Sequence, residues 1–199
     1  MKQNVVRSVN ELPTYGFDSQ SGPWWGAMAF IALEGMGFAI AVAAYLYLYA
    51  VNPKWPLNAP PPDLWPGTLA TIVFLLSAIP NELTNRKARA LDRRGVQIGM
   101  VIMSLIAVVL LVIRGFEFAH LNTRWDTDAY GSVVWLILAL HTTHLATDAG
   151  DTIVLTVLMF TRHATPRRFS DVTDNVFYWN FVVLAWLPIY FLLDWTPRL

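Results

Sequence analysis

The chain has 199 residues, of which 55% are hydrophobic and only 14% are charged, and its formal net charge is zero. A soluble domain usually carries about a quarter charged residues, so this deficit indicates a membrane protein. The balanced charge gives no indication of a nucleic-acid partner. The absence of cysteine excludes disulfides, iron–sulfur clusters and cysteine-ligated zinc.

Five apolar segments are each long enough to cross the hydrocarbon core of a bilayer, which takes about 20 residues of helix. We therefore predict an all-α fold: a single membrane domain, 1–199, built as a bundle of five transmembrane helices. The spans are expected at residues 24–50, 65–83, 96–118, 130–161 and 175–195. A proline-rich loop separates the first two spans, and stretches rich in arginine, expected to be loops, follow the second and the fourth.

Lysine and arginine are distributed unevenly over the two sides of this predicted bundle. One side holds Lys2, Arg7, Arg86, Lys87, Arg89, Arg93, Arg94, Arg162, Arg167 and Arg168, and the other holds Lys54, Arg124 and Arg198. The positive-inside rule places the N-terminus and both arginine-rich stretches in the cytoplasm and the C-terminus outside. An odd number of spans agrees with that orientation.

The fourth span carries a stripe of ionisable side chains. His141, His144, Asp148 and Asp151 follow one another in steps of three, four and three residues, which places them on one face of a helix. Ionisable groups inside a membrane are costly, so this face should lie against protein or water rather than lipid. The polar groups available to match it in other spans are Glu34, Arg114, Glu117 and Asn180.

These groups allow two interpretations. The two imidazoles can face one metal ion or haem, with Glu34 and Glu117 as further ligands, as in a self-contained membrane metal or haem enzyme. Alternatively, both rings are neutral and form hydrogen bonds between helices. In that case Glu34 should be protonated or matched by a donor such as a histidine of another helix.

Arg114 and Glu117 are one helical turn apart, so they can pair with each other. Arg114 can equally reach a lipid headgroup or a partner subunit. The residues by themselves leave these partners open. A transporter is a third alternative, but it would call for an inverted repeat or discontinuous helices, and the sequence shows neither.

Four stretches, in order along the chain, carry a resemblance to a known family. They are FIALEGMGFAIAVAAYLYLY with Glu34, the proline-rich WPLNAPPPDLWPGTLATIVFLLSA, RGFEFAHLNTRWDTDAYGSVVWLILALHTTHL, and YWNFVVLAWLPIY. Together they resemble subunit III of haem–copper cytochrome c oxidases in a shorter, five-helix bacterial form. The sequence departs from the family pattern at Arg114, usually glutamine, at Leu140, usually glycine, and at Asn180 and Val183, which replace a histidine and an aspartate.

The resemblance implies an accessory subunit of a terminal oxidase, or of a related nitric oxide reductase, in a bacterial inner membrane. Such a subunit packs on catalytic subunit I, with subunit II in the same complex, and serves respiratory electron transport and proton translocation. Haem and copper belong to the partner subunits, so we expect no catalytic residue, metal or redox cofactor in this chain. Bound phospholipid and support of proton uptake and of stable turnover are also implied.

The candidate functional residues form two groups. The buried polar groups related to proton movement are Glu34, Glu117, His141, His144 and Asp148. The candidates for contact with lipid or a partner subunit are Trp24, Trp25 and Arg114.

Overall fold

The computed structural model describes residues 16–162 and 164–199. Its five long helices are α1 (Gly22–Val51), α2 (Leu64–Arg89), α3 (Arg93–Ala119), α4 (Ala129–Phe160) and α5 (Pro166–Tyr190). A 3-10 turn, η2 (Asp18–Gln20), precedes α1, and a π-helical segment, η3 (Phe191–Trp195), with a 3-10 turn, η4 (Thr196–Arg198), continues α5. The described residues contain no strand, and all five helices are long and apolar enough to cross a membrane. The predicted all-α, five-span fold is confirmed.

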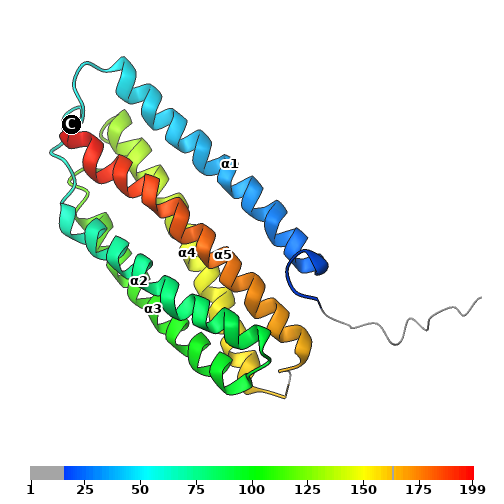
Figure 1. Ribbon diagram of the computed structural model, residues 1–199. Coiled ribbons are helices and arrows are strands. Elements are labelled where there is room, and N and C mark those ends of the chain that lie inside the picture. Colours follow the sequence, from blue (N-terminus) through cyan, green and yellow to red (C-terminus); the bar gives the residue numbers. More distant parts are fainter. Residues whose placement is uncertain (1–15, 163) are drawn as a thin grey trace, which may run out of the picture.

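Helices α2, α3, α4 and α5 form a ring in which each helix packs against two others of the ring, and α1 lies outside it against α4 and α5 (Figure 1). Consecutive helices run in opposite directions, so α1, α3 and α5 all start from the same end of the bundle. The bundle therefore has one end with the starts of three helices and another with the starts of α2 and α4.

Large aromatic side chains fill the interior of the ring. Trp179 and Trp186 of α5 are almost completely buried, and Phe74 of α2 lies between them with ring centroids 6.4 and 6.0 Å away. Each indole N–H donates to a hydroxyl of α2, Trp179 to Ser77 at 2.9 Å and Trp186 to Thr71 at 2.8 Å. A buried indole needs such a partner, so these bonds help to position α5 against α2.

Helix α1 is held differently, because only Phe38, Ala41 and Tyr45 of its residues are buried. The Tyr45 hydroxyl donates to the carbonyl of Leu192 in η3 at 2.8 Å and accepts from the Trp55 indole at 3.0 Å. Polar contacts therefore help to hold the C-terminal part of α1 against the bundle.

The ends of two helices differ from the prediction. The arginine-rich stretches were expected to be loops, but α2 continues to Arg89 and α5 already begins at Pro166. Ion pairs along the helix stabilise these extra turns, with Arg86 bonded to Glu82 at 2.8 Å and Arg168 to Asp171 at 2.7 Å. Proline is also well suited to the first turn of a helix, where its missing N–H is not needed.

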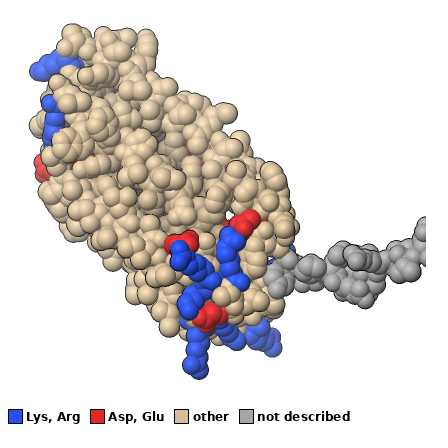
Figure 2. All heavy atoms as spheres, in the orientation of Figure 1, with Lys and Arg blue, Asp and Glu red and all other residues tan. Residues whose placement is uncertain are grey.

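Cationic side chains gather at the end of the bundle where α1, α3 and α5 start (Figure 2). We call this the basic end; its described cations are Arg86, Lys87, Arg89, Arg93, Arg94, Arg162, Arg167 and Arg168. Arg89 also binds both carboxylate oxygens of Asp18 in η2, at 2.7 and 2.8 Å, and this contact lowers the pKa of Asp18. The charge asymmetry is thus present on the folded surface, while the direction of the bundle in a membrane stays a prediction.

Gly131 and Gly150 of α4 provide a matched test of how closely α4 packs against the loop that precedes it. A Cβ atom at Gly131 would lie 2.1 Å from the backbone carbonyl oxygen of Arg124, whereas one at Gly150 would meet nothing within 4 Å. We expect Gly131→Ala to lower the free energy of unfolding by about 1–3 kcal/mol, because the backbone of the loop must move. Gly150→Ala should leave it unchanged or raise it by up to about 1 kcal/mol. Melting temperatures in mild detergent report the difference, and equal values for the two variants would contradict this packing.

Candidate functional site

The predicted stripe on α4 faces the inside of the bundle. His141, His144 and Asp148 are buried, and Asp151, closest to the basic end, is exposed. The expectation that this face lies against protein is confirmed for the three buried residues. Two separate polar clusters are built on it, one around His144 and one around His141.

The first cluster joins Glu34 of α1 to His144 of α4 and Tyr178 of α5. Glu34 Oε1 lies 3.1 Å from His144 Nε2, and Glu34 Oε2 accepts a hydrogen bond of 2.6 Å from the Tyr178 hydroxyl. The structure thus places a histidine of another helix beside Glu34, which is one of the two arrangements expected for this residue, the other being a protonated carboxyl group. The Phe38 ring packs on the imidazole, with centroids 4.8 Å apart, and helps to shield it.

The hydrogen bonds of this cluster limit the positions that its protons can take. His144 Nδ1 is 2.6 Å from the carbonyl oxygen of Leu140, which can only accept, so Nδ1 carries a hydrogen. A neutral His144 therefore presents the lone pair of Nε2 to Glu34, and one proton must lie between the two groups. The pair is either a carboxylic acid with a neutral imidazole or a carboxylate with an imidazolium. In both cases Glu34 and His144 together hold one exchangeable proton.

The second cluster joins Arg114 and Glu117 of α3 to His141 of α4. Arg114 Nη1 bonds Glu117 at 2.6 Å, Arg114 Nη2 lies 3.1 Å from His141 Nδ1, and the side chains of this ion pair are only 2% and 5% exposed. His141 Nε2 donates to the carbonyl of Val182 in α5 at 3.0 Å, so the ring is neutral and its Nδ1 accepts from Arg114. The guanidinium also lies 4.1 Å from the centroid of the Trp186 ring.

The sequence left the partner of Arg114 open between Glu117, a lipid headgroup and a partner subunit. In the structure Arg114 is 1% exposed and bonds Glu117 and His141 in the interior. Asn180, which replaces a histidine of the family pattern, also has an interior partner, because its Oδ1 accepts from Asn81 of α2 at 2.9 Å.

These bonds bear directly on the alternative of a metal or haem site. All four ring nitrogens of His141 and His144 are engaged by protein groups, so neither ring offers a free lone pair. A metal site needs several converging ligands. No cluster of three or more His, Asp or Glu side chains that could hold a metal occurs in the part of the chain that the structure describes. The geometry favours helix clamping over metal binding.

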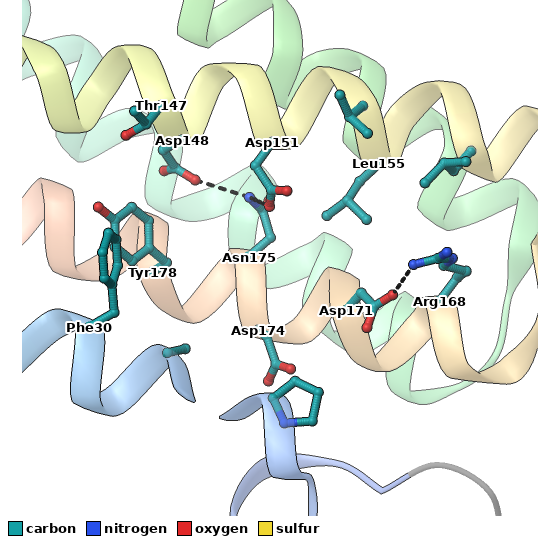
Figure 3. Close-up of a pocket in the computed structure, with 14 residues that line it drawn as sticks. Phe30, Thr147, Asp148, Asp151, Leu155, Arg168, Asp171, Asp174, Asn175 and Tyr178 are labelled. Atoms are coloured by element: carbon teal, nitrogen blue, oxygen red, sulfur yellow. Dashed lines mark hydrogen bonds and ion pairs between the residues drawn. The ribbon is translucent and has the colours of Figure 1, made fainter. Parts of the chain in front are cut away.

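A pocket of about 550 Å³ opens at the basic end between α1, α4 and α5 (Figure 3). We call it the acidic pocket, because four carboxylates line it: Asp148, Asp151, Asp171 and Asp174. Asn175 donates to Asp148 at 3.0 Å and to Asp151 at 3.2 Å, whereas Asp174 points away from Asn175 toward the start of α1. Tyr178 also lines this pocket and so connects it to the Glu34 cluster.

Sequence reasoning singled out Asp148 but not Asp174, Asn175 or Tyr178. The sequence predicts a loop up to residue 174, so Asp171 and Asp174 lie outside the predicted span and the helical spacing that joins them to Asn175 and Tyr178 is hidden. Asp171, Asp174, Asn175 and Tyr178 follow in steps of three, one and three, which place them on one face of α5. That spacing was the available signal.

Trp24 and Trp25 lie in the first turn of α1, at the basic end. Their rings contact each other edge to face at 5.0 Å, Trp24 also packs on Phe177, and the Trp25 indole N–H donates to the carbonyl of Ser19 at 3.0 Å. The Trp25 side chain is 60% exposed. Their contact with lipid or a partner stays a prediction.

The fold and the site define a polytopic helical membrane protein whose two α4 histidines are bonded to groups of neighbouring helices. A family model described as cytochrome c oxidase subunit III matches residues 3–197. "Cytochrome c oxidase subunit 3" of Rhizopus stolonifer is 25% identical over 89% of this chain and 70% of its own length. The protein of the same name from Thermostichus vulcanus is 23% identical over 84% of both chains. "Probable cytochrome c oxidase subunit 3" of Mycobacterium leprae (strain TN) is 26% identical over 83% of both.

The chain belongs to the cytochrome c oxidase subunit III family, whose members are accessory subunits of haem–copper oxidases. The resemblance noted in the sequence is thereby confirmed over nearly the whole chain.

The buried ion pair of α3 can be tested against an exposed one. Glu117→Ala leaves the Arg114 charge buried without its counterion, so we expect the free energy of unfolding to fall by about 3–5 kcal/mol. Asp126→Ala breaks the pair with Arg124, whose side chain is 75% exposed, and should leave the melting temperature unchanged, because water screens that charge. A similar melting temperature for both variants in mild detergent would show that the interior ion pair does not stabilise the fold.

Proposed function

We propose that this chain is the accessory subunit III of a haem–copper terminal oxidase in a bacterial inner membrane, and that it packs on catalytic subunit I in a complex that also holds subunit II. In this proposal haem and copper stay in the partner subunits, and this chain supports proton uptake and stable turnover. The observation that carries the proton role is the Glu34–His144–Tyr178 cluster, which holds an exchangeable proton between three helices.

The orientation follows from the same proposal. The basic end faces the cytoplasm, in keeping with its excess of arginine and lysine, and the C-terminus lies outside. Trp24 and Trp25 then lie at the cytoplasmic membrane surface, where an amphipathic ring is favoured, and they contact phospholipid there.

The accessory role is tested by purifying the complex through a tag on this chain in mild detergent. We expect haem and copper spectra to appear together with a large multi-helix partner and to vanish when a harsher detergent removes that partner. Stoichiometric metal or haem retained by the isolated chain would overturn the proposal and return His141 and His144 to the role of ligands.

The proton role is tested with Glu34→Gln in the assembled oxidase. The amide keeps the size of the side chain but cannot pass on a proton, so turnover should fall increasingly as the pH rises and protons become scarce. Glu82→Gln is the control, because Glu82 is an exposed carboxylate of α2 that pairs with Arg86 and Asn85 of its own helix. An unchanged pH profile of turnover in Glu34→Gln would remove Glu34 from proton delivery.

A further inference from the structure

Within residues 16–162 and 164–199, two aspartates of the acidic pocket have carboxylate oxygens without a hydrogen-bond partner. Asp148 is 2% exposed and this applies to its Oδ2, and Asp174 is 9% exposed and this applies to both of its oxygens. Both line the pocket. Buried carboxylate oxygens strongly favour a hydrogen-bond donor, so these atoms call for a ligand that donates to them.

Water fits this pocket in both size and chemistry. A water molecule occupies about 30 Å³ in the liquid, far less than the 550 Å³ of the pocket. It also needs two to four polar partners, and Asp148, Asp151, Asp174 and Asn175 provide them from α4 and α5. Ala27 and Phe30 make the α1 wall apolar, so an acyl chain is the competing occupant that the experiment must distinguish.

Tyr178 connects the pocket to the Glu34–His144 pair. Tyr178 lines the pocket (Figure 3). Its hydroxyl donates to Glu34 at 2.6 Å. The titratable groups that face Glu34 are His144 and Asp148 from α4 and Tyr178 from α5. A hydroxyl that borders both water and a carboxyl group can exchange hydrogen with each of them.

We propose that the acidic pocket is hydrated and is the route by which the Glu34–His144 pair exchanges protons with the aqueous phase at the basic end, with Tyr178 as the relay. This inference rests on the proposed proton role of Glu34 and identifies its point of entry. The unpartnered oxygens of Asp148 and Asp174 offer hydrogen-bonding sites that orient the water in the pocket.

The proton balance of the relay is simple. A proton enters the pocket from the aqueous phase as hydronium. Glu34 Oε2 takes the phenolic hydrogen of Tyr178, and the phenol oxygen takes a proton from that hydronium, which becomes water. The proton on the Oε1 side of Glu34 moves onto His144 Nε2, so the pair has gained one proton, and the reverse order releases it.

Hydration is tested by placing a single cysteine in this chain, which has none of its own. Thr147→Cys lies at the pocket, and Ala146→Cys is the control, because Ala146 is exposed at the same depth of α4 but does not line the pocket. Only a hydrated thiol ionises readily to the reactive thiolate. A small cationic methanethiosulfonate should therefore modify Thr147→Cys at least about tenfold faster, as read from the mass of this chain in the intact complex. Equal, slow modification of both would mean an acyl-filled pocket and would overturn the inference.

The route is tested by narrowing the pocket with Ala27→Phe, against Ala29→Phe as a control on the same helix that does not line it. The infrared bands of the Glu34–His144 pair are identified by their loss in Glu34→Gln, and their deuterium exchange is followed after transfer to D₂O. We expect slower exchange in Ala27→Phe and in Tyr178→Phe, and the wild-type rate in Ala29→Phe. A wild-type rate in all three variants would overturn the route.

The proton route through the pocket and the proton role of Glu34 in turnover can be overturned independently of each other. If the pocket variants slow exchange but Glu34→Gln keeps a normal pH profile of turnover, the route stands and the proton role in the oxidase fails. If that profile changes while exchange is unaffected by the pocket variants, Glu34 acts in turnover but receives its proton elsewhere.

Discussion

The two imidazoles of α4, one turn apart, are the constraint on which the rest of the bundle depends. Both nitrogens of each ring must be satisfied inside the protein, because the hydrocarbon around the bundle offers no hydrogen-bond partners. His141 meets this need with Arg114 of α3 and a carbonyl of α5, and His144 meets it with its own helix and Glu34 of α1. These bonds therefore determine which helices lie next to α4 and how far each is shifted along the axis of α4.

The position of α1 depends on this constraint most directly. In a membrane, apolar contact between helices brings little gain over contact with lipid, so specific polar and packing contacts decide how helices associate. Helix α1 buries few of its own side chains, and Glu34 and Tyr45 anchor it at the middle and near the far end. The same arrangement leaves the acidic pocket between α1, α4 and α5 at the basic end, so the contact that positions α1 also places Glu34 within reach of the pocket.

The interior charged groups differ in whether an opposite charge is bonded to them. Arg114 has Glu117 and the face of Trp186 at one end of the α4 stripe, which keeps that region neutral and closed. Asp148 and Asp174 at the other end have no cation bonded to them, and they border a pocket instead. The interior is thus sealed around His141 and open to a pocket beside His144, and this difference explains why we assign proton exchange to the second cluster only.

The sequence by itself determined the five spans, the inward-facing stripe from His141 to Asp148, the asymmetry of loop charges and the family. All of these depend on local composition or helical spacing, which a single chain segment reveals. The structure alone decided the partners: His144 rather than another donor for Glu34, and Glu117 with His141 for Arg114. In the structure α5 begins at Pro166, so Asp174 is helical, lies one turn before Tyr178 and lines the pocket. Such partners depend on how separate helices are rotated about their axes and shifted along them. Packing sets these two quantities, and the spacing of residues within one helix does not encode them.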